Sequence, residues 1–241
     1  MLQTVDQLRK KYSFVENIDG QKGISLVMNV DTGCLYVQKK LTEYNRNVYR
    51  LLKSSGISGI PKIYELVEAK GTLYIIEEYI YGYTMDQLYD KGVRFKEDQL
   101  VGYMIRLLQI LNEVHSLNPP VIHRDIKPSN LMITQKNQLY LIDFNAAKQV
   151  HDDSLGNRDT VFMGTQSFAA PEQYGYSQSG PYTDIFALGI TLNYLLTGKA
   201  SRDQIYEGEC SDIIRKCIKL EPSDRYQSAK ELEEALSMLS L

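Results

Sequence analysis

Before about residue 80, apolar and polar positions alternate in runs typical of half-buried strands. The runs form two pairs, and a turn sequence that contains glycine lies between the two runs of each pair. These turns are Asp31-Thr32-Gly33 in the first pair and Ala69-Lys70-Gly71 in the second. The four runs are 24–30, 34–41, 63–68 and 72–79, and apolar residues at helical spacing predict helices over 4–12 and 41–53. This part of the chain therefore predicts a small antiparallel sheet with one main helix.

Helical periodicity dominates the chain after about residue 84. The predicted helices are 98–116, 184–196, 212–220 and 229–239, and short strand runs lie at 121–122, 131–133 and 139–142. A small sheet-rich part followed by a larger helical part predicts an α+β fold in two lobes, with an N-lobe of about 1–80 and a C-lobe of about 84–241.

The composition is that of an ordinary globular protein. The chain has 241 residues, of which 43% are hydrophobic and 24% charged, and its net charge is −3. These values argue against intrinsic disorder, and no nucleic-acid partner is expected. Cys34, Cys210 and Cys217 form no Cys-x-x-Cys pair, which disfavours a disulfide framework or a zinc site. Because no apolar run of about 18 residues occurs, we expect no membrane span and a cytoplasmic location.

Three motifs in a fixed order carry the candidate chemistry. They are His123-Arg124-Asp125-Ile126-Lys127-Pro128-Ser129-Asn130, Asp143-Phe144-Asn145 and Ala170-Pro171-Glu172. Taken singly, Asp and Asn in such loops are ordinary turn residues. Together these motifs resemble the catalytic loop, the metal motif and the APE motif of the protein kinase family. The resemblance covers nearly the whole chain and implies a bilobal kinase-like fold, with a single catalytic domain over 1–241.

The resemblance implies a Ser/Thr protein kinase that uses ATP and Mg²⁺ and acts on protein substrates. Asp125 stands where the family keeps the carboxylate that accepts the proton of the substrate hydroxyl, and Lys127 where it places a cation near the γ-phosphoryl group. Asn130 and Asp143 stand at the positions of the metal ligands, and both carry the oxygen donors that Mg²⁺ prefers. Asp125 and Lys127 are the predicted catalytic residues, and Asn130 and Asp143 are the predicted metal ligands.

The predicted phosphate-binding residues lie in the sheet-rich part. Gly20 and Gly23 keep two glycines of the family's phosphate-covering loop, a weak signal because an ordinary strand turn has the same pattern. Tyr36-Val37-Gln38-Lys39 resembles the strand whose lysine contacts the α- and β-phosphates. This makes Lys39 the expected lysine, with Lys40 as the alternative.

Residues 73–80, Leu73-Tyr74-Ile75-Ile76-Glu77-Glu78-Tyr79-Ile80, resemble the strand that leads into the hinge. Backbone groups of Glu78 and Ile80 would hold adenine, and Met132 would form the apolar floor beneath it. This register puts Glu77 at the gatekeeper position, which is normally apolar, where a buried carboxylate needs a cation. If the register is off by one residue, Glu77 points to solvent.

The family pairs its phosphate-binding lysine with a glutamate on the helix of the small lobe, and this chain departs from that pattern. Positions 47–48, where that glutamate is expected, hold Asn and Val, and the nearest acid on the predicted helix is Glu43. We therefore hypothesise that Glu77, alone or with Glu43, anchors Lys39. The alternative is that the helix swings out and Lys39 pairs with Asp143.

Residues 143–172 match the activation segment, in which we expect autophosphorylation. Its hydroxyl-bearing candidates are Ser154, Thr160, Thr165 and Ser167, with Thr160 the leading site. Thr165 matches the threonine that contacts the catalytic aspartate and lysine in Ser/Thr kinases. Asn145 replaces the glycine of the metal motif, and we expect it to tolerate a positive φ.

Three further residues match structural positions of the family. Asp184 is expected to hold the backbone of the catalytic loop, and Arg225 to pair with Glu172. The segment 199–211 leaves room for at most a short helical piece, which predicts a reduced substrate-docking platform.

Two other functions remain open on the sequence. One is a pseudokinase scaffold that binds nucleotide, and the other is a kinase-like phosphotransferase acting on small molecules. The sequence leaves the oligomeric state open.

Overall fold

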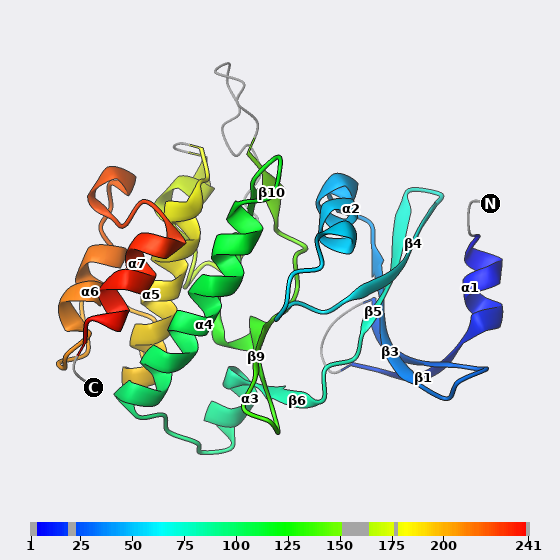
Figure 1. Cartoon of the computed structure of the whole chain (residues 1–241), viewed down its shortest axis with the longest axis horizontal. Coiled ribbons are helices and arrows are strands. Elements are labelled where there is room, and N and C mark those ends of the chain that lie inside the picture. The colour runs from blue at the N-terminus through cyan, green and yellow to red at the C-terminus, as the bar shows by residue number, and fades with distance from the viewer. Residues whose placement is uncertain (1–3, 19–22, 151–163, 176–177, 240–241) are drawn as a thin grey trace. The chain divides into compact units, whose positions relative to one another are not determined.

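The computed structural model describes residues 4–18, 23–150, 164–175 and 178–239 of the chain. The chain divides into two compact units (Figure 1). Unit 1 comprises Met1–Gly56 and Ile60–Tyr81, and unit 2 comprises Ile57–Gly59 and Gly82–Leu241. Unit 1 holds a five-stranded sheet and unit 2 holds most of the helices, so the fold is α+β as predicted.

Unit 1 is built on an antiparallel sheet with the strand order β1-β2-β3-β5-β4. Its strands are β1 (Tyr12–Asn17), β2 (Ile24–Asn29), β3 (Leu35–Leu41), β4 (Ile63–Ala69) and β5 (Thr72–Glu78). Helix α1 (Val5–Lys11) lies on one side of this sheet and helix α2 (Arg46–Ser55) on the other (Figure 1). The four predicted strands are confirmed, and β1 is a fifth that the pattern did not reveal.

Helix α2 begins later than the predicted 41–53, because Asn45 caps it. The Asn45 side chain accepts hydrogen bonds from the backbone N–H groups of the second and third helical residues, at 3.1 and 3.4 Å. Glu43 is exposed and lies in the bend that precedes this cap. The expectation that Glu43 lies on this helix is therefore wrong.

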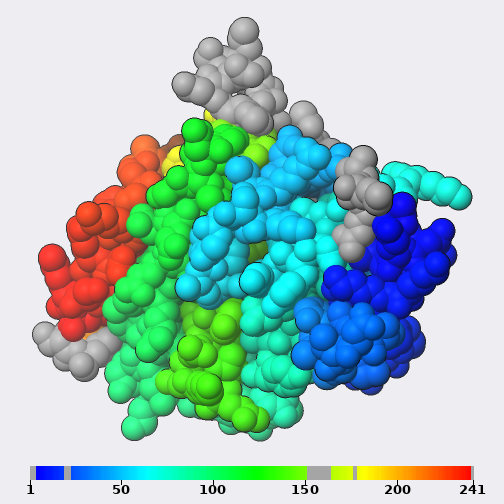
Figure 2. Space-filling view, turned by 45° about the vertical axis from the view of Figure 1, so that its right-hand side comes forward, coloured from blue at the N-terminus to red at the C-terminus, as the bar shows by residue number. Residues whose placement is uncertain are grey.

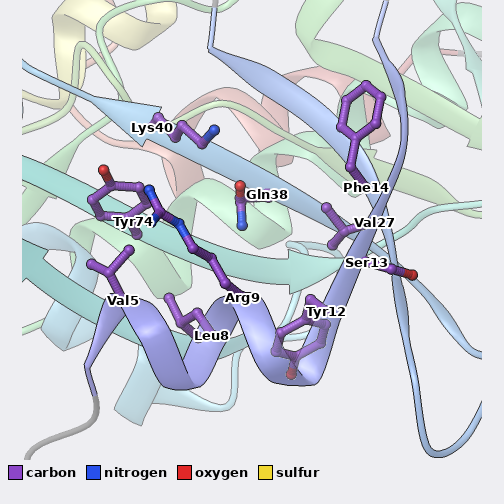
Figure 3. Close-up of a pocket in the computed structure, with 10 residues that line it drawn as sticks. All are labelled: Val5, Leu8, Arg9, Tyr12, Ser13, Phe14, Val27, Gln38, Lys40 and Tyr74. Carbon is purple, nitrogen blue, oxygen red and sulfur yellow. The ribbon is translucent and has the colours of Figure 1, made fainter.

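The alternation of side chains along β3 puts its two lysines on opposite faces of the sheet. On the α1 side, Gln38 and Lys40 line a pocket together with Tyr74, which is the strand partner of Lys40 (Figure 3). Lys40 is exposed there. Lys39 projects to the opposite face and is 4% exposed.

Unit 2 is mainly helical. Its helices are α3 (Met85–Asp90), α4 (Glu97–His115), α5 (Pro181–Thr197), α6 (Ser211–Cys217) and α7 (Ala229–Ser237). Short 3₁₀ turns cover Pro128–Asn130, Pro171–Tyr174 and Pro222–Asp224. Helix α5 is buried nearly all round, and α7 packs along α4 (Figure 2). Among the helices that the structure describes, none combines the length and apolar composition needed to span a bilayer.

Two small sheets complete unit 2 and carry its loops. One has the order β6-β8-β9, and the other pairs β10 with β7. The strands are β6 (Gly82–Thr84), β7 (Val121–Ile122), β8 (Leu131–Thr134), β9 (Leu139–Leu141) and β10 (Lys148–Gln149). The segment between β7 and β8 holds the first motif, and the segment after β9 holds the second.

The connection from α5 to α6, residues 198–210, is fully described and contains no helix. The buried side chain of Asn193 organises it, because its amide nitrogen donates to the carbonyl oxygens of Lys199, Ser201 and Gln204 at 3.2, 3.0 and 3.0 Å. The prediction that this segment has no room for a full docking helix is confirmed.

Candidate active site

Asp125 is the centre of a polar cluster in the loop between β7 and β8. Its Oδ2 lies 2.8 Å from the Lys127 Nζ and accepts a hydrogen bond from the Asn130 Nδ2 at 3.0 Å. The same Nδ2 donates to the backbone carbonyl of Asp125 at 2.8 Å. A tight 3₁₀ turn at Pro128–Asn130 makes this possible by folding the loop back on itself. The two predicted catalytic residues and one predicted metal ligand are thus in direct contact.

Thr165 closes the cluster from a distant part of the chain. Its backbone N–H and its hydroxyl donate to the Asp125 Oδ1, at 3.0 and 3.1 Å, and the Lys127 Nζ donates to its Oγ1 at 2.6 Å. The predicted contact of Thr165 with both residues is confirmed. With four donors on its two oxygens, the Asp125 carboxylate is held in one orientation while its side chain remains 11% exposed.

Asp184, in the first turn of α5, holds the backbone of the catalytic loop from below, as predicted. Its carboxylate accepts the backbone N–H groups of His123 and Arg124 at 2.9 and 2.7 Å and contacts the His115 Nε2 at 2.8 Å. Burial acts to raise the pKa of Asp184, but the hydrogen bonds and charges of its partners, His115 first among them, together hold the pKa below its usual value. Arg124 adopts φ +68°, a strained conformation that the surrounding contacts maintain.

His123 connects the catalytic loop to the second motif. Its Nδ1 accepts the backbone N–H of Asp125 at 3.3 Å, its Nε2 contacts the Ile142 carbonyl at 3.2 Å, and its ring meets the Phe144 ring edge-on at 4.7 Å. Full burial lowers the pKa of His123 and so favours the neutral ring, which needs one nitrogen as acceptor and one as donor.

A backbone hydrogen bond joins the last residue of the first motif to the residue that precedes Asp143, the first residue of the second motif. The N–H of Ile142 donates to the carbonyl of Asn130 at 2.9 Å, so the two predicted metal ligands belong to adjoining segments. Asp143 itself has φ +66°, whereas Asn145 is not among the residues with positive φ. The expectation for Asn145 is therefore corrected, because the unusual backbone angle falls at the acid and the residue two positions later needs no glycine.

The third motif is fixed by a buried ion pair. Arg225 Nη1 and Nη2 lie 2.7 and 3.0 Å from the two oxygens of Glu172, and the two side chains are 0% and 1% exposed. Thr183 also donates to Glu172, at 2.8 Å. The remaining guanidinium donors of Arg225 bind backbone carbonyls, including that of Lys219 at 2.8 Å. This confirms the predicted pair and leaves it well satisfied despite its burial.

In unit 1, the predicted pair of Lys39 and Glu77 is present. The Lys39 Nζ lies 2.9 Å from the Glu77 Oε1, and the side chains are 5% and 9% exposed. The structure thus places Glu77 inside and not in solvent. Because Lys40 faces the α1 side, Lys39 is the lysine that fits the motif.

The remaining predicted nucleotide-binding residues occupy distinct positions. Gly23 has φ +88°, and a Cβ there would come within 2.8 Å of the Lys40 carbonyl oxygen, so glycine is required; Gly20 lies outside the described residues. Glu78 ends β5, where its N–H donates to the Lys62 carbonyl at 2.8 Å, and Ile80 follows it, 6% exposed. Met132 is half-buried in β8 of unit 2.

Comparison with known proteins identifies the family. The sequence model of the protein kinase domain family matches residues 20–238 of this chain. The chain belongs to the protein kinase domain family. Similar proteins include serine/threonine-protein kinases F and B of Synechocystis, each 34% identical, over 68% and 74% of this chain, and a probable serine/threonine-protein kinase of Clostridium acetobutylicum, 24% identical over 90% of it. The matched regions are 36%, 35% and 37% of those proteins, so this kinase domain corresponds to about a third of each relative.

One supporting residue of this kinase domain was missed by the sequence analysis. Gln173 is 0% exposed, donates from Nε2 to the Arg124 carbonyl at 2.8 Å and accepts the N–H of Ala170 at 3.0 Å. It links the third motif to the backbone of the catalytic loop. A polar residue directly after the Ala-Pro-Glu motif is the only signal that the sequence offers for it.

Proposed function

We propose that this kinase domain transfers the γ-phosphoryl group of ATP to Ser and Thr hydroxyls of proteins, with its two units acting as one catalytic domain. The observation that carries the proposal is the cluster of Asp125, Lys127 and Thr165. It presents an oriented carboxylate beside an ammonium, the pair needed to accept a proton and to stabilise a transferring phosphoryl group. The similar Synechocystis proteins are named serine/threonine-protein kinases, which supports Ser and Thr as acceptors.

The roles follow the geometry of the cluster. The Asp125 carboxylate takes the proton of the acceptor hydroxyl as that oxygen bonds to the γ-phosphorus, and the bond from the γ-phosphorus to the bridging oxygen of ADP breaks. Lys127, at 2.8 Å from Asp125, offsets negative charge on the transferred group. Unit 1 contributes Lys39 for the α- and β-phosphates, and Gly20 and Gly23 for the loop that covers the phosphates. Backbone groups of Glu78 and Ile80 bind adenine, and Met132 of unit 2 contributes an apolar side chain to the adenine ring.

Asn130 and Asp143 fit a magnesium ion by the chemistry of their donors. Both offer hard oxygens, and the Asn130 amide nitrogen is already committed to Asp125, which leaves its amide oxygen as the ligand atom. When bound, Mg²⁺ supplies positive charge that neutralises the phosphate oxygens.

The experiment that tests this function measures transfer and acceptor together. The purified chain is incubated with γ-labelled ATP, Mg²⁺ and generic protein substrates, and the labelled amino acids are identified. The proposal expects phosphoserine and phosphothreonine. ATP binding without transfer would indicate a pseudokinase, and label only on added small alcohols or sugars would indicate a small-molecule phosphotransferase; either result contradicts the proposal.

A further inference from the structure

We propose that Glu77 of strand β5 is the positioning residue for Lys39, in place of an acid on helix α2, so that the lysine is held independently of that helix. The inference rests on the proposed kinase function and concerns how its phosphate-binding lysine is controlled. In protein kinases this lysine pairs with a glutamate of the small-lobe helix, and positioning of that helix controls the pair.

The contact between Lys39 and Glu77 is short and largely excluded from solvent. The Lys39 Nζ and the Glu77 Oε1 are 2.9 Å apart, and neither side chain is more than 9% exposed. Two charges at such low exposure stabilise the fold only when they are paired, so each residue constrains the position of the other.

The register of the sheet makes this contact a fixed feature of unit 1. Val37 of β3 lies opposite Glu77 of β5, and Lys39 lies opposite Ile75. Residues 37, 39, 75 and 77 therefore share one face, and Lys39 and Glu77 are diagonal neighbours on adjacent strands, within reach of two long side chains. Backbone hydrogen bonds between β3 and β5 hold the lysine and its acid at this separation.

Helix α2 supplies no acid that could do the same. Its sequence, Arg46–Ser55, contains no Asp or Glu, and Glu43 is exposed in the bend before it. Helix α2 is instead attached to β4 by its own cations. The Arg46 Nη1 lies 2.7 Å from the Glu68 Oε2, and the Lys53 Nζ donates to the Tyr64 carbonyl at 2.6 Å.

In this arrangement, the positioning of Lys39 is separate from the positioning of helix α2, whereas the family usually couples the two. The acid that holds Lys39 moves with the sheet, while α2 is attached at the neighbouring strand β4. A displacement of α2 leaves the Lys39–Glu77 pair intact, so this lysine has no helix-driven switch. Regulation of this kinase domain must then act on other parts of the site.

The test compares binding of Mg-ATP with binding of adenosine, which lacks phosphates. Glu77→Gln removes the charge and Glu77→Met also removes the acceptor, and both are expected to weaken Mg-ATP binding about tenfold or more, as for loss of a charge-assisted contact. Adenosine affinity is expected to stay within about twofold, because an effect through Lys39 acts on the phosphates alone. Glu77→Asp keeps the charge and should recover part of the loss.

Arg46→Ala and Glu43→Gln are the matched variants at α2. Neither residue contacts Lys39 among the described interactions, so both variants should bind Mg-ATP within about twofold of wild type. A weakening of ATP binding by Arg46→Ala as large as that of Glu77→Met would show that α2 controls the lysine, and would overturn the inference.

Folding of the variants is a further readout. If Glu77→Met does not fold because Lys39 is left buried without its partner, the double variant Lys39→Met/Glu77→Met should fold again, and failure to do so would contradict the pairing. A wild-type domain that transfers phosphate while Glu77→Met binds Mg-ATP equally tightly refutes the inference alone. A wild type that binds no ATP refutes the proposed function and the inference with it.

Discussion

The ammonium of Lys127 lies 2.6 Å from the hydroxyl oxygen of Thr165, although the two residues are 38 positions apart in the sequence. Both also contact the carboxylate of Asp125. The segment around Thr165 is thereby tied to the catalytic loop by side chains of the proposed catalytic residues. Any rearrangement of this segment must change the surroundings of Asp125.

We expect Thr165→Val to lower turnover about ten- to a hundredfold, because it removes the hydroxyl that bridges Asp125 and Lys127. The affinity for Mg-ATP should be unchanged, since Thr165 acts on the acceptor side. Thr165→Ser restores the hydroxyl and should recover most of the turnover, and Ser237→Ala, at an exposed position of α7 outside the activation segment, should have no effect. Steady-state kinetics with a protein substrate measure this, and full turnover in Thr165→Val would contradict it.

Arg225→Met is expected to lower the free energy of unfolding by about 3–5 kcal/mol, because it leaves Glu172 buried without its cation. Arg9→Met is the matched control, since Arg9 and Asp6 are 74% and 86% exposed and such pairs contribute at most about 1 kcal/mol. Urea unfolding of both variants measures the difference. Equal losses in the two variants would mean that the buried pair has no special role.

His123 should make the protein less stable in mild acid. Because its folded pKa is lowered, the unfolded chain binds a proton on His123 at higher pH than the folded chain does. The contribution of the neutral, buried His123 to the free energy of unfolding is fully present above the unfolded pKa of about 6.5. It is lost as the pH falls from there towards the folded pKa, by up to about 1.4 kcal/mol per pH unit. The lowered pKa of Asp184 acts only below about 3.8, outside this window.

The measurement is the unfolding free energy of wild type and His123→Phe between pH 7.5 and 5.5. Whatever its stability at pH 7.5, the variant should lose less stability over this range than wild type does. The same slope in both proteins would place the titrating group elsewhere.

We expect autophosphorylation between Ser154 and Ser167, with Thr160 as the leading site. Ser154 and Thr160 lie outside the described residues, so this stays a prediction from the sequence. Phosphopeptide mapping of wild type and of Asp125→Asn tests it. Phosphate confined to other segments, or present equally in the Asp125→Asn protein, would rule it out.

Much of the fold could be predicted because turns and periodicity agree along the chain. Glycine-containing turns separate β2 from β3 and β4 from β5, and each predicted strand differs from the observed one by a residue at most. Strand β1 was missed because most of its side chains are exposed, with Phe14 at 63%. Helix α3 was missed because it is short and buries only Met85, although the Thr84–Gln87 capping box was a readable signal.

The candidate site divides in the same way. The resemblance to the family predicted the contacts of Thr165 with Asp125 and Lys127, and the hinge register that it suggested predicted the Lys39–Glu77 pair. The position of Asn45 as a cap, which excludes Glu43 from α2, depends on competition between helix and bend that periodicity does not resolve. The positive φ falls at Asp143 itself, a residue type that tolerates this region, so the residue type at 145 could not reveal it.

The most direct measurement is turnover and Mg-ATP affinity on the same preparations of wild type, Asp125→Asn and the control Asp212→Asn, whose side chain is 97% exposed. If Asp125 takes the proton of the acceptor hydroxyl, Asp125→Asn should lose at least about a hundredfold in turnover. It should bind Mg-ATP as wild type does, and Asp212→Asn should match wild type in both. Unchanged turnover in Asp125→Asn would contradict the assignment of this domain as a protein kinase that works through this aspartate.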